Sequence, residues 1–254
     1  MLFKLLTRTV TMVMLAAIIN PIFGQPNHAT EIVRKSDQLM QGDSYISTMT
    51  MKIVRPTWDR TIVFKSWGKG RDLAMTYIKA PAAEKGQSFL KRGNEMWTWN
   101  PKINRLIKLP PSMLSQGWMG SDYTNDDILK ESSIVKDYNH TVVNVENYEG
   151  YDCWVIEMIP KEDAAVVWGK IISHIAKEKY FPLKVRYFNE DGELVKSHLN
   201  SDIKQMDNRD IPTKTIVQPA DTPDKKTIVF IDQIDFNIKL SDQFFSQKNM
   251  KRIR

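Results

Sequence analysis

The chain has 254 residues, of which 36 are Lys or Arg and 30 are Asp or Glu, so its formal net charge is +6. Basic and acidic residues are interspersed and form no basic stripe, which argues against nucleic acid as a partner. The single cysteine, Cys153, excludes an intramolecular disulfide, so folding must depend on a hydrophobic core.

Residues 1–24 have the pattern of a secretory signal peptide. Lys4 and Arg8 form a basic start, an apolar run follows, and Gly24 is a small residue at the expected cleavage point. The apolar run is much shorter than the roughly 20 residues that span a bilayer. We therefore expect a cleaved signal peptide and a mature chain, residues 25–254, in the periplasm; an uncleaved anchor is the alternative.

The mature chain begins with a predicted helix and continues as strands. Apolar residues at near-helical spacing predict a helix over His28–Gln41, with Gly42 as its stop. The apolar period then changes to two, so that Met49, Met51 and Ile53 share one face of a half-buried strand over residues 45–54. Further strands are expected over residues 61–67, 73–79, 86–91, 142–145, 151–159, 170–178, 183–188, 194–203, 214–217 and 228–238, with a hairpin over 97–109.

No repeat, low-complexity tract or flexible linker marks a second domain, so the mature chain is predicted to fold as one domain, mainly of β-structure. An antiparallel sheet of about ten strands curls strongly, and we expect a barrel or half-barrel. Helices are expected to act as a lid over its opening. Besides the first helix, these are a short helix over Thr124–Leu129, begun by the capping-box pair Thr124 and Asp127, and a terminal helix or turn after Ser241.

The sequence contains no motif for catalysis or for binding a cofactor. Its four histidines have no metal-ligand spacing: His28, His140, His174 and His198. We expect His174 and His198 on neighbouring strands, and Cys153 as a small buried hydrophobic residue rather than a nucleophile. Asp126 and Asp127 offer paired carboxylates or calcium ligands, but acids in the first turn of a helix favour its dipole and already explain them. We therefore expect no enzyme activity, no cofactor and no metal.

The stretch Glu95–Leu129 carries large apolar side chains where a protein surface is normally polar. Trp97 and Trp99 are two residues apart and so share one face of a strand. Flexible methionine side chains suit a surface that repacks around variable acyl chains. We predict an apolar cavity and its lid, lined by Met49, Met51, Met96, Trp97, Trp99, Leu114, Trp118, Met119 and Trp154.

A series of residues in this region occurs in a familiar order: Met96–Pro101, Arg105, Leu109, Pro110, Gly120–Tyr123 and Asp126–Leu129. This series resembles the LolA-like outer-membrane lipoprotein-sorting proteins, in a branch distinct from LolA itself, and the resemblance extends over residues 71–254. It implies an unclosed barrel with a helical lid over an apolar cavity. It also implies a carrier without a cofactor, which takes acylated lipoproteins from an inner-membrane transporter to an outer-membrane acceptor.

The residues and the resemblance together predict a periplasmic carrier, expected to be monomeric, that binds lipid or the acyl chains of lipoproteins and delivers them toward the outer membrane. The alternative from another class is an accessory or structural subunit that docks on an envelope transporter through a sheet edge or its apolar loop. An envelope hydrolase is a third hypothesis, and no catalytic site in the sequence supports it.

Overall fold

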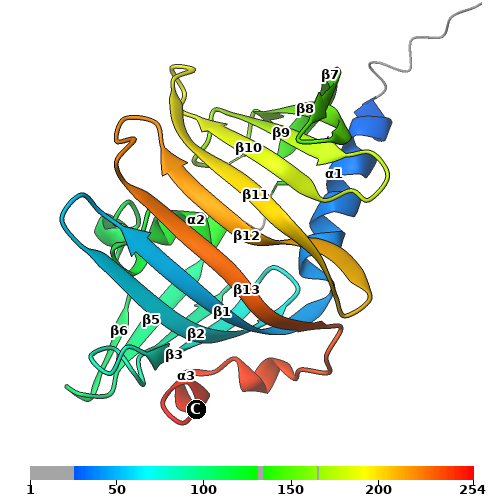
Figure 1. Ribbon diagram of the computed structural model, residues 1–254. Helices are drawn as coiled ribbons and strands as arrows, with labels where there is room; N and C mark the ends of the chain where they lie inside the picture. The colour runs from blue at the N-terminus through cyan, green and yellow to red at the C-terminus, as the bar shows by residue number, and fades with distance from the viewer. Residues whose placement is uncertain (1–25, 131–133, 165) are drawn as a thin grey trace, which may run out of the picture.

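The computed structural model describes residues 26–130, 134–164 and 166–254 (Figure 1). The predicted signal peptide, residues 1–24, lies outside the described residues. Within them, one antiparallel sheet contains thirteen strands. The strands are β1 Ser44–Val54, β2 Asp59–Lys69, β3 Leu73–Ala80, β4 Ser88–Arg92, β5 Glu95–Asn100, β6 Arg105–Lys108, β7 Tyr138–Tyr148, β8 Tyr151–Pro160, β9 Lys170–Ala176, β10 Pro182–Phe188, β11 Leu194–Met206, β12 Arg209–Pro219 and β13 Lys226–Phe236.

The helices are few and mostly short. Only the first exceeds two turns among the described residues, and none of them is long and apolar enough to span a membrane. They are α1 Pro26–Gln41, η1 Pro111–Met113, η2 Trp118–Gly120, α2 Asn125–Lys130, η4 Asp242–Phe244 and α3 Gln247–Met250.

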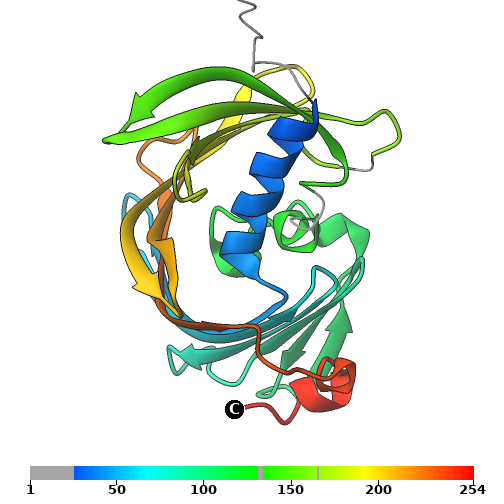
Figure 2. The same ribbon diagram turned by 90° about the vertical axis from the view of Figure 1, so that its right-hand side faces the viewer.

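The sheet consists of two meanders joined at their ends. Its strand order is β6-β5-β4-β3-β2-β1-β13-β12-β11-β10-β9-β8-β7, so the pairing of β1 with β13 connects the first six strands to the last seven. Strands β6 and β7 remain as the two edges of the sheet, which therefore curves into a barrel without closing (Figure 2). The predicted fold is confirmed. The thirteen strands match the segments predicted one by one from the sequence, although the sheet as a whole was expected to contain about ten.

Helix α1 runs across the concave face of the sheet, as Figure 2 shows. Its apolar stripe, which includes Ala29, Ile32 and Val33, is buried against residues of β7–β10. The helix ends where the sequence predicted, because Gly42 adopts a left-handed φ of 61° and its N–H donates to the Gln38 carbonyl at 2.9 Å. One half of the barrel interior is thus filled by a helix.

The connection between β6 and β7 covers the other half of the concave face, and we call its residues 109–130 the plug. Its helix α2 begins with the predicted capping box: Thr124 accepts a bond from the Asp127 N–H (3.0 Å), and Asp127 accepts one from the Thr124 N–H (2.7 Å). Buried ion pairs hold the plug to the sheet, one between Asp122 and Arg55 and one between Asp127 and Lys196.

The convex face of the sheet is covered in part by the C-terminal segment. Phe245 and Met250 pack with apolar side chains of β2–β5, and the Ser88 hydroxyl donates to the Met250 carbonyl at 2.6 Å. The terminal helices predicted after Ser241 therefore form, but they lie outside the barrel and do not cover its opening (Figure 2).

Candidate functional site

An apolar cavity of about 320 Å³ lies between the concave face of the sheet, the plug and the C-terminal end of α1. This volume is within the range of about 300–1,000 Å³ that is typical of small-molecule sites. Strands β1–β5 form one wall of the cavity, and β12 and β13 form another. Met40 of α1 lines a third side, and Trp118 and Ile128 of the plug line the fourth.

The plug tryptophan lies among aromatic residues of the sheet. The ring of Trp118 meets those of Phe64 and Phe89 edge to face, with centroids 5.6 and 5.3 Å apart. These are favourable aromatic geometries, so the indole holds the plug against the cavity wall. Arg55 strengthens this anchorage by donating to the Gly120 carbonyl at 2.9 Å.

Six of the nine predicted site residues lie in this region. Met49, Met51, Met96 and Trp118 line the cavity. Leu114 and Met119 belong to the plug and pack against the same apolar cluster, so they form part of its cover. The structure thus brings together residues from two strands and the plug that are far apart in the sequence.

The other three predicted residues lie elsewhere, which corrects the expectation. Trp97 and Trp99 do share a face, but it is the convex face, where they pack in the cluster that the C-terminal segment covers. Trp154 does face the interior, yet it packs near α1, with its ring centroid 6.0 Å from that of His28 and 5.5 Å from that of Tyr180. None of the three lines the described cavity.

Several cavity residues were missed at the sequence level, including Phe64, Phe89, Val229, Ile231 and Ile234. In β13 the reason is a β-bulge. Ser47 of β1 pairs with Ile234 and Met49 pairs with Ile231, so β13 has one extra residue, Asp232, between these two pairs. Val229 and Ile231 before the bulge and Ile234 after it all face the cavity, and one unbroken alternation along β13 cannot place all three on the same side. Phe64 and Phe89 follow the regular alternation of their strands.

The cavity opens toward a polar groove of about 480 Å³ at the end of α1, with which it shares Gln41, Gly70, Arg71 and Leu73. Arg71 forms an ion pair with Asp37 of the helix. Arg209 binds the helix end from the other side, donating to the Gln38 and Leu39 carbonyls at 2.9 and 3.0 Å. Two arginines therefore fix the end of α1 beside the mouth of the cavity.

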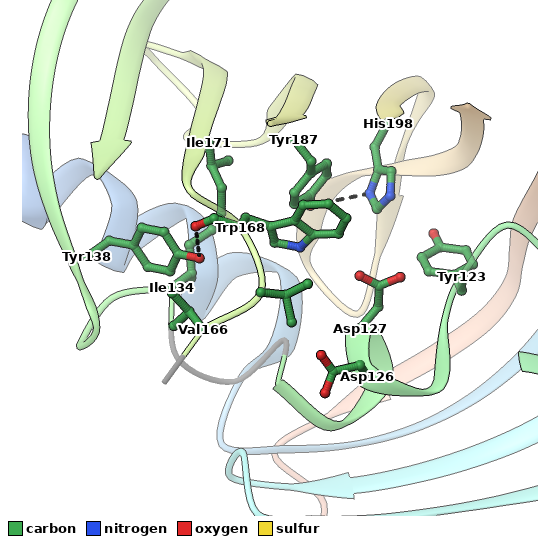
Figure 3. Close-up of a pocket in the computed structure, with 11 residues that line it drawn as sticks. Tyr123, Asp126, Asp127, Ile134, Tyr138, Val166, Trp168, Ile171, Tyr187 and His198 are labelled. Atoms are coloured by element: carbon green, nitrogen blue, oxygen red, sulfur yellow. Dashed lines mark hydrogen bonds between the residues drawn. The ribbon is translucent and has the colours of Figure 1, made fainter. Parts of the chain in front are cut away.

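A second, smaller pocket of about 60 Å³ lies between α2 and the β9–β11 strands (Figure 3). Lys196 is buried there in an ion pair with Asp127, and its ammonium lies 4.8 Å from the ring centroid of Trp168 and 5.6 Å from that of Tyr187. Burial and the nearby Lys196 charge lower the pKa of His198 to about 3. The ion pair beside this pocket therefore joins the plug to the sheet, and the imidazole of His198 in the pocket is neutral.

The remaining titratable candidates do not assemble a reactive centre. His174 and His198 were expected on neighbouring strands, but they lie on β9 and β11 with β10 between them, and His174 bonds to Glu146 at 2.7 Å. Burial raises the pKa of the Cys153 thiol, which disfavours the nucleophilic thiolate. The described residues contain no group of three or more His, Cys, Asp or Glu side chains arranged to hold a metal ion.

Comparison with known proteins agrees with this architecture. A family model described as an uncharacterized protein matches residues 70–252. A DUF1329 family protein of Desulfovibrio piger has a TM-score of 0.79 at 22% identity, over 89% of this chain and 98% of that one. An outer membrane lipoprotein-sorting protein domain of Vibrio parahaemolyticus has a TM-score of 0.76 at 22% identity, over 90% and 100% of the two chains.

A LolA superfamily protein of Nitrosomonas europaea has a TM-score of 0.73 at 22% identity, over 87% of this chain and 98% of that one. Among curated proteins, none is significantly similar in sequence. At this level of identity the three solved structures show a shared fold over almost the whole described chain.

Proposed function

This chain belongs to the family whose model, described as an uncharacterized protein, matches residues 70–252. We propose that it is LolA-like in function as well as in fold, and that it is a periplasmic carrier of lipid or of lipoprotein acyl chains. In this proposal an apolar chain enters the cavity, crosses the periplasm inside the protein and leaves toward the outer membrane. The protein acts as a monomer, receives its cargo from an inner-membrane transporter and passes it to an outer-membrane acceptor.

The apolar cavity is the observation that supports this proposal most directly. Its walls include four flexible methionines, Met40, Met49, Met51 and Met96, which can repack around chains of different shape. Burial of one methylene is worth about 0.8 kcal/mol, so ten methylenes supply about 8 kcal/mol before the chain is ordered. Carriage of this kind needs neither a catalytic group nor a cofactor in the protein.

Native mass spectrometry of the protein purified from the cell envelope tests the proposal, with titration of the delipidated protein by a fluorescent acyl probe as a second measurement. We expect a copurified lipid mass, and saturable probe binding that unlabelled lipid displaces. Folded protein that retains no lipid and binds no probe contradicts carriage.

The alternative, an accessory subunit docked on an envelope transporter, is favoured by one observation. Strand β7 is an edge strand of 11 residues, and its Val143 is 49% exposed. Such an edge can accept a strand from a partner. Val143 lies at a register break, where it has no paired residue on β8, and proline is tolerated at edge strands and bulges, so Val143→Pro is expected to block docking but not probe binding. Loss of a copurifying transporter in this variant, with no lipid in the wild type, favours the alternative.

A further inference from the structure

The turn between β5 and β6 and the C-terminal segment form a surface rich in cations. Residues 96–121 contain three basic residues and no acidic one, and residues 243–254 contain four basic residues and no acidic one. One of the seven, Lys108, pairs with Glu95. The other six are exposed and form no ion pair within the described part of the chain. Together with Ile103 we call them the basic end: Lys102, Arg105, Lys248, Lys251, Arg252 and Arg254.

The fold brings the two segments together, although about 140 residues separate them in the sequence. The Lys251 ammonium lies 5.0 Å from the ring centroid of Trp99, and the Ser88 hydroxyl donates to the Met250 carbonyl. Ser88 pairs with Trp99, and Trp99 pairs with Leu106, at the end of these strands where the β5–β6 turn lies. Figure 2 shows α3 at the lower end of the molecule, against the strands of this half of the sheet. The cations of both segments therefore gather at one end of the molecule.

Acidic residues of the same region do not neutralise these charges. Strands β2–β6 with their turns, and the segment after β13, contain five acidic residues: Asp59, Asp72, Glu84, Glu95 and Asp242. Four of these acids form ion pairs with basic residues outside the basic end. The fifth, Asp72, lies in the β2–β3 turn, at the opposite end of the strands from the β5–β6 turn. The basic end thus keeps an excess of positive charge.

The basic end also carries the most exposed large apolar side chain of the described residues. Ile103 is 62% exposed, in the β5–β6 turn between Lys102 and Arg105. The turn is ordered by its own residues, since the Lys102 N–H donates to the Asn100 side-chain oxygen at 3.0 Å and Asn104 adopts a left-handed φ of 49°. Long basic side chains around a protruding aliphatic one match a surface that is anionic outside and apolar beneath.

We propose that the basic end docks on a lipid bilayer that contains anionic phospholipid, with its cations at the phosphate groups and Ile103 at the boundary of the acyl chains. Charge complementarity supports this partner, because an anionic leaflet attracts basic residues that lie within about a Debye length of it. The exposed isoleucine favours lipid over an acidic protein, since only the bilayer offers an apolar layer directly beneath its charges. The inference goes beyond carriage, because docking requires no ligand in the cavity.

Cosedimentation of the purified protein with vesicles tests the inference, at low and at high ionic strength. One set of vesicles is phosphatidylcholine alone, and the other is phosphatidylcholine mixed with the anionic phosphatidylglycerol. Each basic residue near an anionic membrane surface strengthens binding about fivefold. We therefore expect the protein to bind the mixed vesicles about 100-fold more tightly than the neutral ones at low ionic strength, the effect of about three cations. High ionic strength should remove most of this difference, because it screens exposed charges.

Two double variants locate the docking surface. Lys102→Gln with Arg105→Gln removes two charges of the β5–β6 turn, and Lys248→Gln with Arg252→Gln removes two charges of the C-terminal segment. Each double variant should weaken binding to the mixed vesicles about 25-fold at low ionic strength. All four side chains are exposed, so both variants should fold with a Tm close to that of the wild type, which thermal unfolding verifies.

A matched double variant controls for net charge. Lys136→Gln with Lys204→Gln removes two exposed lysines, one just before β7 and one on β11, and should bind the mixed vesicles like the wild type. Ile103→Ser tests the apolar contact separately. It should weaken binding about fivefold at low and at high ionic strength alike, because salt does not screen the loss of an apolar contact.

Equal binding of the wild type to neutral and mixed vesicles overturns the inference. Double variants of the basic end that bind like the wild type overturn it too, as does a control variant that loses as much affinity as they do. Absence of binding to either kind of vesicle also overturns it and makes an acidic protein the better partner for this surface. Unchanged binding of Ile103→Ser overturns the contact with the acyl boundary. None of these measurements uses the cavity, so they leave the proposed carriage untouched.

Discussion

Removal of Arg55 is expected to detach one end of the plug from the sheet. This guanidinium is largely buried and donates five hydrogen bonds: to both carboxylate oxygens of Asp122 (3.0 and 3.1 Å) and to the carbonyls of Val54 (2.8 Å), Gly120 (2.9 Å) and Lys226 (3.3 Å). The side chains of Arg55 and Asp122 are 12% and 9% exposed. The pair therefore lies largely outside the reach of solvent screening.

The loss of stability in Arg55→Met can be estimated from the state of Asp122 in the variant. The Asp122 carboxylate keeps a bond from the Thr227 hydroxyl (2.6 Å) but loses its counter-ion. Removing one partner of a buried ion pair costs about 3–5 kcal/mol, because the other charge remains buried without compensation. For a chain of this size that cost corresponds to a fall in Tm of roughly 6–20 °C.

Urea unfolding of four proteins measures this effect: the wild type, Arg55→Met, Asp122→Asn and the double variant. The double variant should be less destabilised than the sum of the single variants, since neither charge is then left unpaired. Lys52→Met breaks the exposed Lys52–Asp59 pair (2.8 Å) on the same hairpin and is the matched control, with stability close to that of the wild type. Additive single variants, or a neutral Arg55→Met, would refute the view that this pair anchors the plug.

Three further outcomes follow from the geometry. Met49→Trp should fill the cavity and abolish binding of an acyl probe, whereas Thr61→Trp, on an exposed position of β2, should not. Phe245→Ala should lower the free energy of unfolding by about 3–5 kcal/mol without changing probe affinity, since this buried ring lies on the convex face. His198 titrates at about 3 when folded, against a usual 6.5, so the stability that its neutral form provides is complete above pH 6.5 and is lost as the pH falls toward 3. His198→Leu should remove up to about 1.4 kcal/mol per pH unit from that acid slope, as measured by urea unfolding across this range.

Each of these outcomes has a clear contrary result. Probe binding by a folded Met49→Trp protein would place the ligand outside the cavity. A change of probe affinity in Phe245→Ala would mean that the convex cluster communicates with the site. An acid slope that is identical in the wild type and His198→Leu would mean that the imidazole of His198 is not excluded from water.

Local periodicity predicted the sheet well because a strand with one buried face alternates apolar and polar residues. The inward set Met49, Met51 and Ile53 of β1 was identified in this way. Which face of a strand becomes concave is decided by distant segments. Trp97 and Trp99 have the same spacing as an inward pair, yet Phe245, about 150 residues later, covers them on the convex side.

The pairing of β1 with β13, which joins the two meanders, could also not be predicted from local sequence pattern. Strand β1 pairs with β2 through a turn, which turn residues indicate, but its other partner is β13, at the far end of the chain. Nothing in the residues of β1 specifies that long-range partner. The bulge in this pairing, opposite Met49, then shifts which side chains of β13 face the cavity.

The order of the strands explains why the plug lies where it does. Strands β6 and β7 are the two edges of an unclosed barrel, so the segment that joins them has to cross its opening. The same segment carries Trp118 to the cavity wall, and its ion pairs with Arg55 and Lys196 attach it to both meanders. A cargo too large for the cavity must therefore displace the plug and break a buried pair, at about 3–5 kcal/mol. Since each buried methylene contributes about 0.8 kcal/mol, roughly four to six additional methylenes offset that cost, so chain length itself determines whether a ligand can open the plug.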